Sequence, residues 1–495
     1  MTDVRQPRMT RQGALAGLAA AAAVVATGFA LRLLPGLPTL PDAAADAFTL
    51  VVPGAIFGFL LDRLQSLGRP LLVTGSALAL VAGGALAGAL ADARPATRRR
   101  PLVVAAALSL LTLPLAGLAT ASGSAIALVT VAQWSAFAIL LELALGHRVE
   151  TATSAMRRRV VYAAGVFGGA WLLTYLGGRF VSAANAGPSR WLVSPGTTLA
   201  GTYDAGTGLT NTKDFYVVSK NDIDDPVIAA ADWRLQVQGL RPFAIGYDEL
   251  RGLAAAARPR TLACISNPIG GEYISTGVFG GVPLADLLMR AGLDADTSEV
   301  RFTCADGYTE SLPLAAALDP TTLVAVTLDG QPLARQHGFP ARLVLAGRYG
   351  MKQPKWLTAI RPVTEPYDGY WEVRGWNKDA FVRTFSRMDR PTEGETVGAG
   401  VLVDVGGVAY AGSRGVKGVQ LSFDGGASWQ DARVARVLPN DAWAPFRFAW
   451  TPPAAGTYDV RVRAIDGDGA VQDPTERDSF PDGATGLHRI SVVVR

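Results

Sequence analysis

The pattern of hydrophobic and polar positions divides this chain into two parts. Up to about residue 180, long apolar runs alternate with short polar connections. The runs occupy residues 13–34, 70–91, 101–119, 123–146 and 160–178. Each run is long enough for a helix that crosses a bilayer, which takes about 20 residues. The pattern therefore predicts an α-helical membrane domain of about five spans, a transmembrane anchor, over residues 1–180.

A sixth apolar run, residues 47–61, is shorter and contains Pro53. Basic loops stay on the cytoplasmic side of a membrane, so arginine clusters decide where this run lies. With five spans, all eleven clustered arginines before and between the runs fall on one side, whereas a sixth span would divide them. We therefore expect 47–61 at the outer interface or re-entering the membrane. The part of the chain after residue 180 is then expected on the extracytoplasmic side of a multi-pass cell-membrane protein.

The apolar part is interpreted as an anchor in the lipid bilayer. No run has an Asp, Glu, Lys or His near its centre, and Glu142 lies close to the inner end of the fourth run. Ion and proton pathways usually need ionisable groups within the membrane. A transporter is therefore the less favoured interpretation of residues 1–180.

From residue 181 onward the chain becomes polar and rich in short β-type runs. Runs such as 233–239 and 341–346 alternate with short helical stretches such as 282–291. This alternation predicts a mixed α+β domain over residues 181–384.

Beyond residue 384, turn signals rich in Gly and Asp recur at close spacing. Alternating strands such as 419–423, 446–450 and 458–464 fit between these turns. The pattern predicts an all-β immunoglobulin-like sandwich over residues 385–495. No catalytic constellation is evident there, so we assign this domain to packing or to contact between copies in a homodimer.

Composition and charge narrow the class of protein further. The 495 residues are 49% hydrophobic and 18% charged, which excludes a disordered chain. The net charge of +4 divides into fifteen arginines against seven acids up to residue 180, and 31 basic against 35 acidic residues after it. The C-terminal part is mildly acidic, so we expect no nucleic acid partner.

Cysteine and histidine are too scarce for several kinds of cofactor site. Cys264 and Cys304 cannot build a disulfide framework, and neither lies in a Cys-x-x-Cys setting. The three histidines, His147, His337 and His488, supply no pair of ligands for a haem within the membrane. We therefore expect no haem, and a redox cofactor that needs few protein ligands.

Two segments of the α+β domain carry candidate chemistry. Cys264 ends a strand-like run and opens a loop rich in Gly, Pro and Asn, where a thiolate can face a pocket. Taken alone, such a cysteine is more often a small buried hydrophobic residue. In the second segment, 337–356, glycines accompany basic residues, which suits a phosphate-bearing anion or a solvated basic loop. These basic residues are Arg342, Arg348, Lys352 and Lys355.

Taken together, these residues resemble the sulfite oxidase family of molybdopterin oxidoreductases, specifically its bacterial membrane-anchored members. The resemblance runs from about residue 215 to the C-terminus. It is carried by Phe215-Tyr-Val-Val-Ser-Lys-Asn221, the Cys264 segment with Gly280-Gly-Val-Pro-Leu284, Asp306-Gly-Tyr-Thr-Glu-Ser-Leu-Pro313, His337-Gly-Phe-Pro-Ala-Arg342 and Lys355-Trp356. In the C-terminal domain it is carried by Ala409-Tyr-Ala-Gly412, Ser422-Phe-Asp-Gly-Gly426 and Trp429.

The resemblance implies a molybdenum–molybdopterin cofactor whose metal is ligated by the Cys264 thiolate. Tyr308 matches the active-site tyrosine of the family, and Cys304 is expected to pack near the cofactor. A soft thiolate suits this metal, and oxygen-atom transfer needs a nearby donor. The resemblance also implies a cofactor-binding set of Ser219, Lys220, Asn221, His337, Arg342, Gln353, Pro354 and Lys355.

One departure from the family bears on the substrate. True sulfite oxidases have arginines in the early strand motif and shortly after the cysteine. These arginines have no counterpart here, so Lys220 and Arg374 are the candidate cations. The prediction is a membrane-anchored, molybdenum-dependent oxidoreductase acting by oxygen-atom transfer on a small, sulfur-containing substrate. Electrons would pass to an external or membrane carrier. A sulfoxide reductase of the same family is one alternative, and a non-catalytic membrane-anchored binding protein is another.

A final motif concerns export. Arg157-Arg158-Arg159-Val-Val-Tyr162 directly precedes the last apolar run and resembles a twin-arginine export signal. It is equally well explained as a cluster that keeps its loop in the cytoplasm. Both interpretations stay open.

Overall fold

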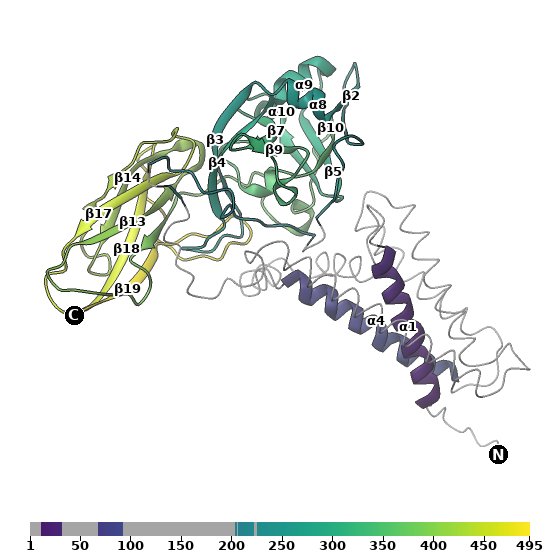
Figure 1. The fold of residues 1–495 in the computed structure, drawn as a ribbon, viewed down its shortest axis with the longest axis horizontal. Helices are drawn as coiled ribbons and strands as arrows, with labels where there is room; N and C mark the ends of the chain where they lie inside the picture. The colour runs from purple at the N-terminus through teal and green to yellow at the C-terminus, as the bar shows by residue number, and fades with distance from the viewer. Residues whose placement is uncertain (1–10, 32–67, 93–202, 205, 222–224) are drawn as a thin grey trace, which may run out of the picture. The chain divides into compact units, whose positions relative to one another are not determined.

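The computed structural model describes residues 11–31, 68–92, 203–204, 206–221 and 225–495 (Figure 1). These residues belong to two compact units, one containing the two N-terminal helices and the other everything from residue 203 onward. The second unit holds all the predicted site residues.

The first unit contains α1 (Arg11–Leu31) and α4 (Gly68–Asp92), which pack through Val25 and Val73. No helix in the part of the chain that the structure describes is long and apolar enough to cross a membrane. The prediction of a helical membrane domain of about five spans is therefore wrong. Both helices are rich in alanine and glycine, whose small side chains bring little apolar surface, so a simple count of apolar residues overstated them.

The other segments behind the membrane prediction lie outside the described residues. They are the runs 47–61, 101–119, 123–146 and 160–178, together with Arg157, Arg158 and Arg159. The extracytoplasmic location of the catalytic domain and the export signal stay predictions.

The second unit begins with the predicted α+β part, which is built on two sheets. One has the strand order β2-β1-β10-β5-β6 and the other the order β3-β4-β7-β8, with β9 paired to β7. Strands of the first sheet are β1 (Arg234–Val237), β2 (Phe243–Gly246), β5 (Glu299–Cys304), β6 (Thr309–Pro313) and β10 (Leu357–Val363). Strands of the second are β3 (Ala256–Ala263), β4 (Ile274–Pro283), β7 (Leu323–Leu328), β8 (Gln331–Pro332) and β9 (Arg342–Val344).

Short helices accompany these sheets. They are α8 (Tyr247–Gly252), α9 (Leu284–Ala291), α10 (Leu314–Ala317) and the 3-10 turns η3 (Arg335–His337), η4 (Gly350–Lys352) and η5 (Glu372–Arg374). In α9 the buried residues are Leu284, Leu287, Leu288 and Ala291, a helical spacing that places one apolar face on the core. The helix ends at Gly292, whose φ of 73° glycine adopts without strain.

The C-terminal part is a sandwich of two sheets, antiparallel except where β12 pairs in parallel with β19 (Figure 1). The sheet orders are β11-β13-β17-β16 and β12-β19-β18-β14-β15. Buried apolar residues of both sheets, such as Val405, Val419 and Val460, form the shared core. The strands are β11 (Phe385–Arg390), β12 (Thr396–Val397), β13 (Val403–Tyr410), β14 (Val416–Ser422), β15 (Gln430–Asp431), β16 (Arg433–Val434), β17 (Ala444–Trp450), β18 (Gly456–Asp466) and β19 (His488–Val494). The 3-10 turn η6 (Gly412–Arg414) joins β13 and β14.

The mixed α+β part and the immunoglobulin-like sandwich predicted from the sequence are confirmed. Their boundaries at residues 180 and 384 stay predictions. What matters for the site is that β3 delivers Cys264 to the region where the two parts of this unit meet.

Candidate active site

Cys264 follows β3 directly and opens a tightly closed loop. Its backbone N–H donates to the Tyr273 carbonyl (2.9 Å), and its own carbonyl accepts from the Asn267 N–H (3.2 Å). The Sγ atom lies 3.1 Å from Ser266 Oγ. Burial raises the pKa of the Cys264 thiol, and hydrogen bonds from Ser266 oppose this shift. The thiol is therefore neutral until a metal binds it and releases its proton.

Three phenols lie around this thiol, and a guanidinium lies near one of them. Burial raises the pKa of Tyr273 to about 12, with the neighbouring Cys264 adding to the shift, and burial raises the pKa of Tyr349 to about 12 as well. The pKa of Tyr216 is raised for the same reasons. Burial lowers the pKa of Arg342 to about 10, which still leaves it charged at neutral pH. The surroundings of Cys264 thus offer neutral O–H groups, and the buried cation Arg342 lies near one of them, Tyr216.

Three of the predicted cofactor segments meet at Lys355. Its Nζ donates to the carbonyl oxygens of Val218 (3.1 Å) and Gln336 (3.0 Å). Gly338 makes this approach close: its φ is 106°, and a Cβ there would lie 3.0 Å from the Cβ of Lys355. Arg342 is also buried at this junction. Only glycine fits at residue 338 without strain.

Arg342 joins two further predicted residues. Its guanidinium donates to the carbonyls of His337 and Gln353, both at 3.2 Å. The carbonyl of Pro354 accepts from the backbone N–H of Leu343 (2.9 Å). The structure therefore brings together the predicted residues of the 337–342 and 353–355 segments.

The early predicted segment is tied to the loop before β6. Ser219 Oγ donates to Asp225 (2.6 Å), and Asn221 Nδ2 donates to Asp306 Oδ2 (3.0 Å). Lys220 Nζ donates to the Asp306 carbonyl at 2.8 Å and lies 3.7 Å from its carboxylate. The positive charge of Lys220 is therefore met by Asp306.

The three predicted catalytic residues other than Cys264 gather around Tyr370. Its ring lies 5.6 Å from the Tyr308 ring, 3.6 Å from the Arg374 guanidinium and 5.3 Å from Lys220 Nζ. Sequence reasoning missed Tyr370, and its only signal was its place beside Trp371 in the segment that contains Arg374.

The turn η4 connects this group to the Cys264 strand. A Cβ on Gly350 would lie 3.4 Å from the Ala263 carbonyl, one residue before Cys264, and 2.9 Å from the Tyr216 hydroxyl. At the next residue, the Met351 carbonyl accepts from the Tyr308 hydroxyl (2.7 Å). Any shift of η4 would therefore displace both the end of β3 before Cys264 and the Tyr308 hydroxyl.

A buried charge cluster anchors η4, and sequence reasoning missed it too. Lys352 Nζ donates to both Glu310 and Glu372, the latter at 2.8 Å. The three side chains are 1%, 0% and 3% exposed. Burial, together with the charge of Glu372, raises the pKa of Glu310 well above its ordinary value, although Lys352 opposes the shift. One lysine thus donates to two carboxyl groups that are shielded from bulk solvent.

This cluster makes a pH-dependent contribution to stability. A carboxyl group whose pKa is raised in the folded state contributes stability below its unfolded pKa, about 4.3, and loses it as the pH rises through the folded value. In the Glu310→Gln variant we expect the fall in the free energy of unfolding between pH 5 and pH 8 to shrink by on the order of 1 kcal/mol. Urea unfolding at several pH values measures this, with the exposed Glu249→Gln as control. Parallel profiles for wild type and Glu310→Gln would contradict the assignment.

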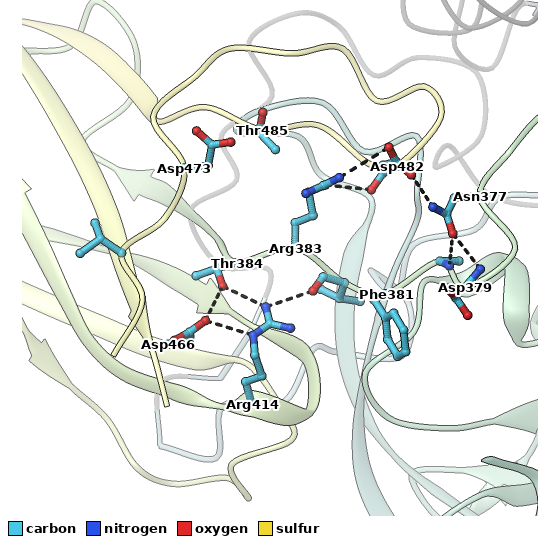
Figure 2. A pocket seen from close by; sticks show the side chains of 13 residues that line it. Asn377, Asp379, Phe381, Arg383, Thr384, Arg414, Asp466, Asp473, Asp482 and Thr485 are labelled. Atoms are coloured by element: carbon cyan, nitrogen blue, oxygen red, sulfur yellow. Dashed lines mark hydrogen bonds and ion pairs between the residues drawn. The ribbon is translucent and has the colours of Figure 1, made fainter. Parts of the chain in front are cut away.

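A pocket of about 450 Å³ lies beside this region, between residues 377–384 and the sandwich (Figure 2). Two ion pairs lie in its wall, Arg383 with Asp482 at 3.6 Å and Arg414 with Asp466 at 3.0 Å. None of the predicted site residues lines it. Tyr349 links the pocket wall to the Cys264 surroundings, because its hydroxyl accepts from the Arg383 N–H (3.2 Å).

Comparison with known proteins gives the class. Residues 222–371 match the oxidoreductase molybdopterin binding domain family, and residues 386–462 match the bacterial Ig domain family. Mitochondrial sulfite oxidase of Rattus norvegicus is 31% identical over 308 residues, 52% of this chain and 56% of that protein. The uncharacterized oxidoreductase YuiH of Bacillus subtilis (strain 168) is 31% identical over 147 residues, 29% of this chain and 72% of that protein.

Two further similarities widen the picture. The putative protein-methionine-sulfoxide reductase subunit YedZ1 of Azospira oryzae is 35% identical over 158 residues, 31% of this chain and 58% of that protein. The crystal structure of the sulfane dehydrogenase SoxCD from Paracoccus pantotrophus aligns with a TM-score of 0.50 at 20% identity, over 59% of this chain and 88% of that one. The latter shows a shared fold only. The chain spans about half the length of the sulfite oxidases it matches.

The domain match and these relatives define a molybdopterin-dependent oxidoreductase, and the chain belongs to the sulfite oxidase family. The resemblance predicted from the sequence is confirmed at the level of the family. The alternative of a non-catalytic binding protein is set aside, because the class is enzymatic. The family implies a molybdenum cofactor, whereas the expectation of no haem stays a prediction.

The residues present fit such a cofactor. Cys264 offers a single soft donor, which suits a metal that brings other sulfur ligands on its pterin. Arg342 Nε is buried and has no hydrogen-bond partner within the described part of the chain, so it can still donate to a ligand. Cys264 would hold the metal, and Arg342 with Lys355 would meet the pterin phosphate. When bound, the group supplies the two-electron chemistry.

Proposed function

We propose that this enzyme transfers an oxygen atom to or from a small sulfur-containing substrate, using a molybdopterin cofactor whose metal is bound by Cys264. The observation that carries the proposal is the thiol at the end of β3, surrounded by neutral phenols, one of which, Tyr216, also lies near the buried Arg342. The names of the relatives, two of which refer to sulfite and to a sulfoxide, support a sulfur substrate. Tyr308, Lys220 and Arg374 are proposed to act near the substrate.

The charges of the site favour a neutral substrate over an anion, and hence sulfoxide reduction. Residues 265–271, directly after the cysteine, include no basic side chain. Lys220 is engaged by Asp306, and Arg374 lies on the Tyr370 ring. A sulfite dianion would need desolvated cations for binding. A sulfoxide needs two protons and two electrons and yields a sulfide and water, with the electrons coming from an external carrier.

A substrate comparison tests the proposal. For the full chain loaded with molybdenum, we expect kcat/KM for reduction of a dialkyl sulfoxide by a reduced viologen dye to exceed that for sulfite oxidation. The expected ratio is at least about tenfold, the effect of one charge–charge interaction of about 1.4 kcal/mol. A ratio in favour of sulfite returns the assignment to sulfite oxidation. No turnover of either substrate by the loaded protein overturns the proposed function.

A further inference from the structure

The C-terminal sandwich contacts the chain on both sides of Cys264. On the strand side, Arg260 of β3 donates to Asp441 (2.7 Å). The next residue, Thr261, accepts from the Tyr410 hydroxyl through its carbonyl (3.3 Å) and from the Trp443 N–H through Oγ1 (2.8 Å). These contacts hold the last residues of β3 in place before Cys264.

On the loop side, the key residue is Arg387 of β11. Its guanidinium donates to the Gly271 carbonyl (3.0 Å) and to Asp389 (2.7 Å). Arg387 and Asp389 are 2% and 4% exposed. A buried ion pair is costly to keep, so hydrophobic residues would serve stability alone as well or better. The contact with Gly271 indicates that the pair serves to bind the Cys264 loop.

His488 of β19 completes the contact. Its Nδ1 accepts from the Met388 N–H (3.0 Å), and burial lowers the pKa of His488 to about 4, so the ring is neutral. Gly270 lies against this ring, since a Cβ at residue 270 would be 2.3 Å from His488 Cδ2. The junction between the loop and the sandwich leaves a cavity of only about 20 Å³, room for one water molecule.

We propose that the sandwich is part of the active site, and that Arg387 is a positioning residue which holds the loop carrying the metal-ligating cysteine. This role goes beyond the packing or dimer contact that the sequence suggested for the domain. It rests on the proposed function only in that Cys264 is taken as the ligand. The contacts of the sandwich with β3 and with the loop after Cys264 fix the direction of the Cys264 side chain, as a preorganised ligand requires.

The test removes the buried pair as a unit, in the variant Arg387→Met/Asp389→Asn, so that no buried charge is stranded. Two readouts are independent of substrate. The first is the rate at which iodoacetamide alkylates Cys264 in full-length protein made without cofactor, with Cys304 as internal reference. The second is the molybdenum content per chain after expression with cofactor supply. The matched control is Arg461→Met/Asp459→Asn, a pair of the same domain that is likewise two residues apart on one strand but far more exposed, at 31% and 44%.

We expect Cys264 to be alkylated on the order of tenfold faster in the variant, with Cys304 unchanged, because local opening exposes the loop alone. Molybdenum content should fall several-fold, and the control should match wild type. Unchanged alkylation of Cys264 overturns the proposal, and so does an equal rise at both cysteines, which would mean general loosening. If the double variant does not fold, the same two measurements are made on Arg387→Lys. We expect smaller changes in the same direction, in both the alkylation rate of Cys264 and the molybdenum content. Failure of the sulfur substrate assignment would leave both readouts intact.

Discussion

Replacing Cys264 by serine is expected to lower the turnover of the molybdenum-loaded enzyme by at least about a hundredfold. A serine hydroxyl is a harder donor than a thiolate and keeps its proton at neutral pH, so the proposed bond between the metal and residue 264 would be lost. The same variant should carry less molybdenum per chain. Steady-state turnover with the preferred sulfur substrate and elemental analysis of the purified protein measure both effects.

Cys304 supplies the matched control. It is buried at the end of β5, where burial raises the pKa of its thiol well above the ordinary value. In Cys304→Ala we expect turnover and molybdenum content within about twofold of wild type, since only packing is lost. A Cys264→Ser enzyme that keeps full activity would remove the central residue from the proposed mechanism.

The sequence predicted the parts of this site that lie in contiguous motifs. The segments 337–342 and 353–355 were assigned to the cofactor through the family resemblance, and the structure joins them at Lys355 and Arg342. The sandwich was predictable because strands such as β18 and β19 alternate between buried and more exposed positions. The helical membrane domain was mispredicted, since apolar length alone does not measure how much apolar surface Ala-rich helices carry.

What the sequence could not give is the pairing of distant charges. Arg387 and Asp389 are both buried, and Arg387 contacts Gly271 of the Cys264 loop, which lies more than 100 residues upstream. Periodicity gives the faces of a strand, but only tertiary packing decides which face is covered by another domain. For the same reason a domain without catalytic residue types was assigned to packing or to contact between copies in a homodimer.

Lys352→Met is expected to have the largest effect on stability. It leaves Glu310 and Glu372 buried without a cation, and breaking a buried charge pair in this way costs about 3–5 kcal/mol. Because Lys352 belongs to η4, loosening should also reach the Tyr308 contact with Met351. The free energy of unfolding from urea titration at pH 7 measures the loss.

Two further variants separate charge from packing. In the triple variant Lys352→Met/Glu310→Gln/Glu372→Gln no charge is stranded, so we expect most of the lost stability to return. Arg290→Met breaks the exposed pair between Arg290 and Glu249 and should cost less than about 1 kcal/mol. Equal stability of Lys352→Met and wild type would contradict the view that this lysine neutralises the two carboxylates. If the triple variant is no more stable than Lys352→Met, the loss comes from the missing lysine contacts. Lys352 would then stabilise the fold through its geometry and not through its charge.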